Sequence, residues 1–257
     1  MKSNNLKQIL YLVVCILIPM VSFGNKTPRE LFEQGNASYA KSQYKEALNA
    51  YQDLLNEGYQ SVAVYFNMGN ASYKLGDIPS ALLYYEKAHK LSPGDEDINF
   101  NIRFANLKTA DKIDEAPVFF LSSWWRKFIL SFSISTLSVL SVIFVLAASI
   151  ILIVYFFSNS VSLKKLAFYA SVTSFCLGLL TIFISGRQTS YFDAHKQAII
   201  FSSSVSVKNG PVNNSGTLFI LHDGTKVNIL DNDNGWIKIR LANGNEGWIK
   251  SGDVKEI

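Results

Sequence analysis

Two long apolar runs dominate the pattern of hydrophobic and polar positions in this chain. They extend from Phe128 to Phe157 and from Leu166 to Ile184, and neither contains Asp, Glu, Lys, Arg or His. About 20 apolar residues in a helix cross a bilayer core, and lipid offers no partners to an open backbone. The pattern therefore predicts two transmembrane helices, over residues 128–157 and 166–186. The alternative is a pair of buried helices in a globular core.

Residues 1–24 have the pattern of a secretory signal peptide. Two lysines precede an apolar run, and the small residues Ser22 and Gly24 stand at positions −3 and −1 of a cleavage site after residue 24. An uncleaved anchor helix is the alternative. Both interpretations send the segment after Asn25 across the membrane.

The topology that follows is a two-pass membrane protein with both soluble parts on the non-cytoplasmic side. A short cytoplasmic loop, residues 158–165, joins the two spans and carries Lys164 and Lys165, as the positive-inside rule prefers. Basic residues at the outer flanks, Arg126, Lys127 and Arg187, partly offset that preference.

A 34-residue repeat occupies the segment before the apolar runs. The pentapeptide Gly35–Tyr39 recurs unchanged as Gly69–Tyr73. The period and the pattern of small and aromatic residues resemble the tetratricopeptide repeat. The likeness is strong over residues 62–95 and weaker in the unit before it, while residues 96–112 predict a half-unit that covers the open end. We expect an all-α solenoid over residues 25–116.

The first helices of such repeats line a concave groove, and eight side chains are predicted there. They are Phe32, Asn36, Tyr39, Phe66, Asn70, Tyr73, Phe100 and Phe104. The two asparagines would suit a clamp for a peptide carboxylate, but Phe32 stands where such a clamp needs Lys. An aromatic groove for an extended or helical partner segment fits better. The simpler alternative for each aromatic is packing within the stack.

The membrane entry is an interfacial linker over residues 117–127, where Trp124 and Trp125 precede two basic residues. In the second apolar run, Ser171, Ser174 and Gly178 are small residues spaced for close helix approach. This spacing would hold the hairpin together or join it to a partner helix.

After a linker over residues 187–195, residues 196–257 change to short alternating runs separated by turns. Five candidate strands predict a small all-β barrel. The run from Leu221 to Val227 and the Gly-Trp-Ile segments at Gly235 and Gly247 resemble the bacterial SH3-type domain, which binds peptides or cell-wall material or acts as a spacer. Its candidate recognition surface is Phe219, Trp236 and Trp248, although both tryptophans could simply belong to the barrel wall.

The net charge of +4 does not predict a nucleic-acid partner, because the excess lies at the N-terminus and at the membrane flanks. The two cysteines, Cys15 and Cys176, lie in apolar segments, and removal of the signal peptide would leave one. The three histidines are isolated in the sequence, and we find no catalytic motif, no metal-ligand spacing and no cofactor loop. We expect a protein that is not an enzyme and has no cofactor.

The module order is a signal peptide, tetratricopeptide repeats, two membrane helices and an SH3-like barrel. That fold class, a multidomain membrane protein, resembles the BatE-type proteins of the bacterial aerotolerance operon. The segments Asp111-Lys112-Ile113, Trp124-Trp125 and Leu221–Gly224 strengthen the likeness. The resemblance implies a scaffold or adaptor of the bacterial inner membrane, with both soluble domains in the periplasm. It would work with von Willebrand factor A-domain proteins and a MoxR-type ATPase, and it would be linked to oxidative stress or envelope function. The alternative is an envelope protein that binds peptidoglycan through the barrel.

Overall fold

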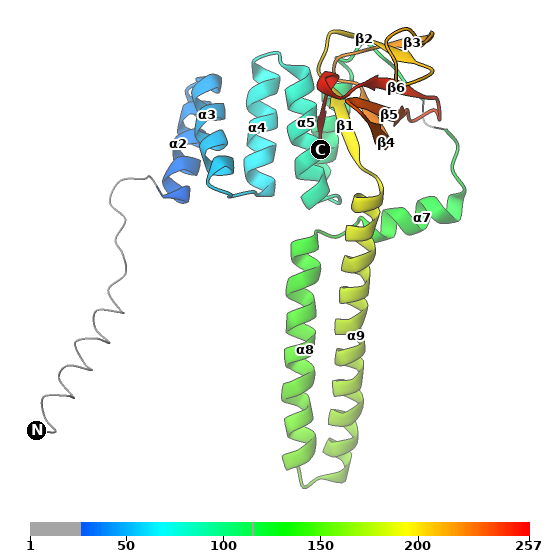
Figure 1. Ribbon diagram of the computed structural model, residues 1–257. Coiled ribbons are helices and arrows are strands. Elements are labelled where there is room, and N and C mark those ends of the chain that lie inside the picture. The colour runs from blue at the N-terminus through cyan, green and yellow to red at the C-terminus, as the bar shows by residue number, and fades with distance from the viewer. Residues whose placement is uncertain (1–26, 115) are drawn as a thin grey trace, which may run out of the picture.

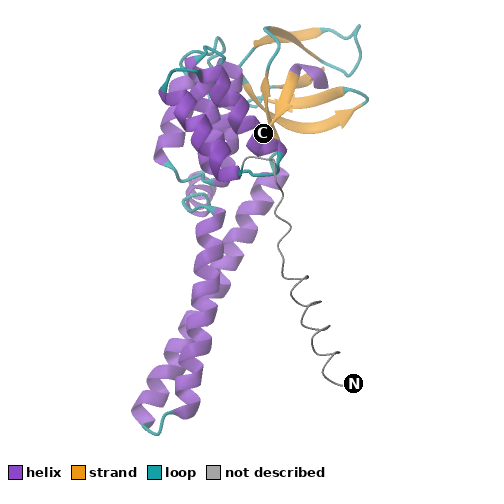
Figure 2. Cartoon of the chain, turned by 90° about the vertical axis from the view of Figure 1, so that its left-hand side faces the viewer, coloured by secondary structure: helices purple, strands orange, loops and turns teal. Residues whose placement is uncertain are grey.

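The computed structural model describes residues 27–114 and 116–257, so the predicted signal peptide lies outside the described residues. The chain forms a helical repeat domain, an apolar helical hairpin and an antiparallel sheet domain (Figure 1). The two soluble domains lie side by side at the same end of the hairpin, which extends away from them (Figure 2).

The repeat domain is built from two antiparallel helix pairs and a single last helix. These are α2 (Pro28–Ala40), α3 (Tyr44–Asn56), α4 (Val62–Lys74), α5 (Ile78–Leu91) and α6 (Glu96–Asn106). Side chains of Thr27, Ser61, Asp77 and Asp95 accept backbone N–H groups at four helix starts, which satisfies donors that a helix leaves open. The observed helices agree with the predicted two and a half units.

Glycine lets the two helices of each pair cross closely. A Cβ atom at Gly35 would lie 2.3 Å from the Tyr51 ring, and one at Gly69 would lie 2.5 Å from the Tyr85 ring. Tyr51 and Tyr85 are themselves buried. The 34-residue recurrence of Gly and Tyr therefore has one physical cause, which is a ring packed on bare helix backbone.

Two helices, α8 (Ile134–Phe157) and α9 (Val161–Ala194), are long and apolar enough to cross a membrane. Helix α9 continues beyond the apolar run through the segment that we expected to be a linker. The first apolar run, expected to be one helix over 128–157, is divided between two helices. Helix α7 (Phe120–Ile129) ends within it, and α8 begins after Ser133, whose side chain accepts the Thr136 N–H. Helix α7 lies beside α9 at the soluble-domain end of the hairpin and extends sideways from it (Figure 1).

The small residues of α9 face α8. The Ser171 hydroxyl donates to the Ala148 carbonyl at 2.9 Å, and the Ser174 hydroxyl donates to the Phe144 carbonyl at 2.8 Å. At Gly178 a Cβ atom would lie 3.1 Å from the Val145 side chain. The spacing found in the sequence thus holds the hairpin together.

The C-terminal domain is a seven-stranded antiparallel sheet in the order β3-β2-β6-β5-β4-β1-β7. Its strands are β1 (Gln197–Ile200), β2 (Ser204–Lys208), β3 (Thr217–His222), β4 (Lys226–Asp233), β5 (Trp236–Arg240), β6 (Glu246–Lys250) and β7 (Val254–Glu256). The predicted closed barrel is corrected, because the described edge strands β3 and β7 do not pair with each other. The five predicted strands are present, and β1 and β7 are additional.

Candidate functional site

A ladder of hydrogen bonds runs along the first helices of the repeat domain. The Asn36 side-chain oxygen accepts the Tyr51 hydroxyl at 2.7 Å and the Asn67 amide at 3.0 Å. One repeat later, the Asn70 oxygen accepts the Tyr85 hydroxyl at 2.8 Å and the Asn101 amide at 3.2 Å. The ladder therefore joins α2, α4 and α6 along one face.

This ladder fixes which way the two asparagine amides point. Burial raises the pKa of Tyr51 and of Tyr85, so both hydroxyls stay protonated and act as donors. The side-chain oxygens of Asn36 and Asn70 accept from the tyrosine hydroxyls, so the NH2 group of each amide lies on the other side. Each NH2 group can then donate to a different acceptor. The groove thus offers donors at a repeat spacing.

The predicted groove aromatics differ in their exposure. Phe32 and Phe66 are half-buried and pack against the rings of Tyr51 and Tyr85, and half-buried Tyr39 packs edge-on against Tyr44. At the far end, Phe100 and Phe104 stack with ring centroids 6.0 Å apart, and Tyr73 lies 5.5 Å from Phe104. Phe100 is 57% exposed and Phe104 is 45% exposed. The structure therefore brings Tyr73, Phe100 and Phe104 together as an accessible aromatic cluster.

The outer face of the sheet domain carries an aromatic and basic strip. Strand pairing places Trp236 opposite Lys250 and Trp248 opposite both Lys238 and Lys208. Neighbouring residues in these strands, such as Ile237, Ile239 and Ile249, are buried in the core. Both tryptophans are half-buried on the outside. Phe219 instead packs partly against the core of the sheet domain, so the three predicted residues do not form one equivalent surface.

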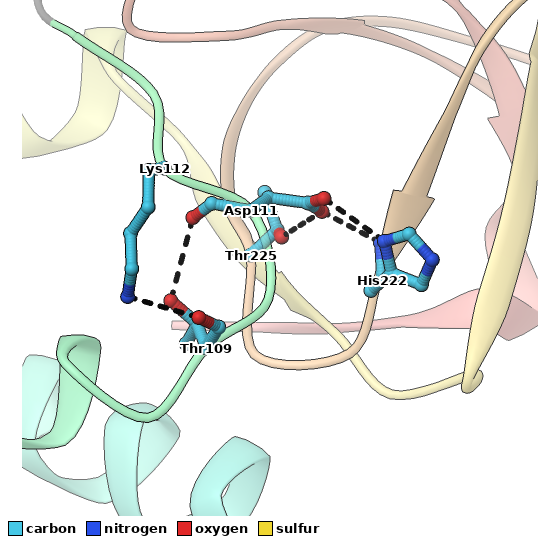
Figure 3. Close-up of polar contacts among 5 residues, drawn as sticks. All are labelled: Thr109, Asp111, Lys112, His222 and Thr225. Carbon is cyan, nitrogen blue, oxygen red and sulfur yellow. Dashed lines mark hydrogen bonds and ion pairs between the residues drawn. The ribbon is translucent and has the colours of Figure 1, made fainter.

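A third cluster joins the two soluble domains (Figure 3). The Asp111 carboxylate, in the segment after α6, accepts the His222 backbone N–H at 2.7 Å and the Thr225 hydroxyl at 2.7 Å. The His222 ring Nδ1 lies 2.9 Å from the same carboxylate. We call Asp111, His222 and Thr225 the interdomain latch. Burial alone would raise the pKa of Asp111, but the hydrogen bonds from His222 and Thr225 outweigh it and lower the pKa.

Apolar and charged contacts extend this junction. Ile199 of β1 is fully buried in a cluster that includes Leu82 and Tyr85 of the repeat domain. The Lys226 ammonium lies 2.8 Å from the Glu86 carboxylate, whose side chain is only 4% exposed. This packed junction therefore fixes the position of the repeat groove relative to the sheet face.

Sequence reasoning missed this junction because its partners are far apart in the chain. The histidines are isolated in the sequence, but the fold brings His222 into contact with Asp111. The only available sign was indirect, since both residues lie in segments that strengthened the family resemblance. Among the described residues, no group of three or more His, Cys, Asp or Glu side chains could hold a metal ion.

Two family models match parts of the chain. The tetratricopeptide repeat matches residues 62–95, and the bacterial SH3 domain matches residues 203–255. These matches confirm both kinds of domain, and the first has the same limits as the unit that the sequence predicted. No curated protein matches the chain.

Among solved structures, an NlpC/P60 family protein from Bacillus cereus is 14% identical, with a TM-score of 0.21. The similarity covers 28% of this chain and 23% of that one, so the chain spans less than a quarter of that structure. A likeness of this extent carries no functional argument.

Proposed function

We propose that the chain is a membrane-anchored scaffold whose repeat groove binds an extended or helical segment of a partner protein. The observation that supports this most directly is the combination of the exposed Phe100–Phe104 stack with the directed amides of Asn36 and Asn70. Aromatic anchors next to fixed hydrogen-bond donors are typical of peptide-binding surfaces.

Helices α8 and α9 are the membrane anchor in this proposal. Their outward residues are apolar over most of their length; for example, Ile150 is 63% exposed and Phe183 is 55% exposed. A face of this size is stable in lipid and is an association hazard in water. Because both soluble domains lie at one end of the hairpin, a single compartment contains both recognition surfaces, and we assign it to the periplasm.

The module order and the family resemblance support a finer assignment. We assign the chain to an aerotolerance complex in the bacterial inner membrane. Its partners there are von Willebrand factor A-domain proteins and a MoxR-type ATPase system. The role in this proposal is binding and not catalysis.

Phe100→Ala/Phe104→Ala should weaken partner binding about 10- to 100-fold, because exposed aromatic anchors contribute most of the energy of such interfaces. A photocrosslinking residue at position 104 identifies the partner in cells, and its affinity is then measured with the full chain in nanodiscs. Tyr59→Ala is the matched control, because Tyr59 is 52% exposed and lies between helices α3 and α4. Equal loss for both variants, or loss for neither, contradicts the groove assignment.

A second candidate function is binding to peptidoglycan through the strip of Trp236, Trp248 and their lysine neighbours. Tryptophan faces stack on sugar rings, and lysines pair with the carboxylates of stem peptides. The full chain is the right material for this test, because separating the sheet domain would expose Ile199. Trp236→Ala/Trp248→Ala should abolish co-sedimentation with purified sacculi. Ile220→Ala, at a position 54% exposed, should not affect it. Sedimentation of the double variant at the unmodified level excludes this role.

A further inference from the structure

A pocket of about 390 Å³ lies where α7 meets the last turns of α9. Helix α7 contributes Trp125, Arg126 and Ile129, and helix α9 contributes Arg187, Ser190 and Tyr191. The pocket is formed by the two elements at the soluble-domain end of the apolar hairpin (Figure 1).

The pocket is lined by two arginines and also by His195. No Asp or Glu side chain lines it. Within the described residues 27–114 and 116–257, no carboxylate lies within 4.0 Å of the Arg126 or Arg187 guanidinium. Both guanidinium groups line one pocket without a protein carboxylate beside them, and a bound anion would supply the missing counter-charge.

A neighbouring pocket of similar size shows the contrast. It is lined by Lys87 and Lys90, but it also contains Asp193, and the Lys90 ammonium donates to the Ile257 carbonyl at 3.2 Å. Its lining thus includes a carboxylate, and one of its two ammonium groups already donates to the protein. The arginine pocket is therefore the stronger candidate for an anionic ligand.

The residues around the arginine pocket are of the kind found at the level of lipid headgroups. The exposed face of α7 carries Phe120 at 73% exposure and Trp124 at 60%, and aromatic residues of this kind gather at membrane interfaces. Gln188 of α9 is fully buried and donates through its side-chain amide to the Phe132 carbonyl at 3.0 Å. This bond ties the turn after α7 to α9 and fixes the pocket relative to the hairpin.

We propose that Arg126 and Arg187 bind the phosphodiester of an anionic glycerophospholipid. Each guanidinium presents a planar pair of donors that matches phosphate oxygens, while Ser190 and Tyr191 offer hydroxyl donors to the headgroup. The acyl chains lie along the exposed apolar side chains of α9. This inference depends on the proposed membrane insertion, and it gives a purpose to basic residues that the positive-inside rule disfavours at the outer flank.

The test uses the full chain in detergent, with native mass spectrometry of added phosphatidylglycerol and phosphatidylcholine. The unmodified chain should retain phosphatidylglycerol at least about tenfold better than phosphatidylcholine, and Arg126→Gln/Arg187→Gln should remove that preference. Arg126→Lys/Arg187→Lys, which keeps the charge but loses the forked donors, should show an intermediate preference. Lys164→Gln/Lys165→Gln removes the same charge at the other end of the hairpin and should leave the preference unchanged.

The outcomes separate three explanations. If inorganic phosphate or soluble glycerophosphoglycerol displaces the lipid at millimolar concentration, the site recognises free phosphate and the lipid assignment is overturned. If an inserted chain shows no preference, or if the double Gln variant keeps it, the site is also overturned. Carbonate extraction of membranes tests the anchor separately, because a chain released by this treatment contradicts the proposed insertion itself.

Discussion

Gly69→Ala should destabilise the repeat domain by about 3 kcal/mol, although alanine is the better helix former by about 0.5–1 kcal/mol. The new methyl group would lie 2.5 Å from two carbons of the Tyr85 ring. That ring has little room to move, because Tyr85 is 3% exposed and its hydroxyl donates to Asn70. Either the helices separate or the ladder bond breaks, and both outcomes loosen the groove.

Hydrogen exchange of the α4 and α5 amides in the full chain measures this loss. Tryptophan fluorescence would not report it directly, because all four tryptophans lie outside the repeat domain. Gly252→Ala is the control, because nothing lies within 4 Å of its added Cβ and its backbone is not left-handed. In a Tyr85→Leu background, Gly69→Ala should cost much less, which gives a coupling free energy of at least about 1 kcal/mol. Additive effects of the two substitutions would contradict the proposed clash.

Much of the repeat domain and the hairpin could be predicted because their determinants are local in the sequence. Gly69 and Tyr85 are close enough in the chain to form one repeated pattern, and Asp77 predicts the start of the helix that it caps. The groove residues followed from the same period. The exposure of these residues could not be predicted from the period. Only the packed structure shows that Phe66 contacts the Tyr85 ring while Phe100 is exposed to solvent.

The sheet domain shows where local patterns stop being informative. Strands β2, β5 and β6 alternate buried residues with more exposed ones, which the sequence reveals. Strand β1 has Ala198, Ile199 and Ile200 buried in succession, because one face of it meets the sheet core and the other meets α5. A short apolar run of this kind has no period to detect. The domain junction was therefore invisible until the fold was known.

Asp111→Ala should weaken the docking of the two soluble domains by about 3 kcal/mol. The substitution removes the acceptor of the His222 backbone N–H, the His222 ring and the Thr225 hydroxyl. Thr225 is 5% exposed, so water reaches its hydroxyl poorly and the lost bond is not fully replaced. Faster hydrogen exchange at the amides of residues 198–201 and 222–225 in the full chain is the expected signature.

Asp114→Ala serves as the matched control, because Asp114 is an exposed carboxylate three positions later, and Asp111→Asn keeps an acceptor without the charge. Acid provides an independent test of the same contact. Because the pKa of Asp111 is held below its ordinary 3.8 in the docked state, its contribution is complete above pH 3.8 and disappears as the pH falls through the lowered pKa. Normal exchange in Asp111→Ala would mean that Ile199 and the Glu86–Lys226 pair hold the domains without the latch. The fixed spacing of the groove and the sheet face would then depend on apolar burial, and a substitution at Ile199 would be the change that separates them.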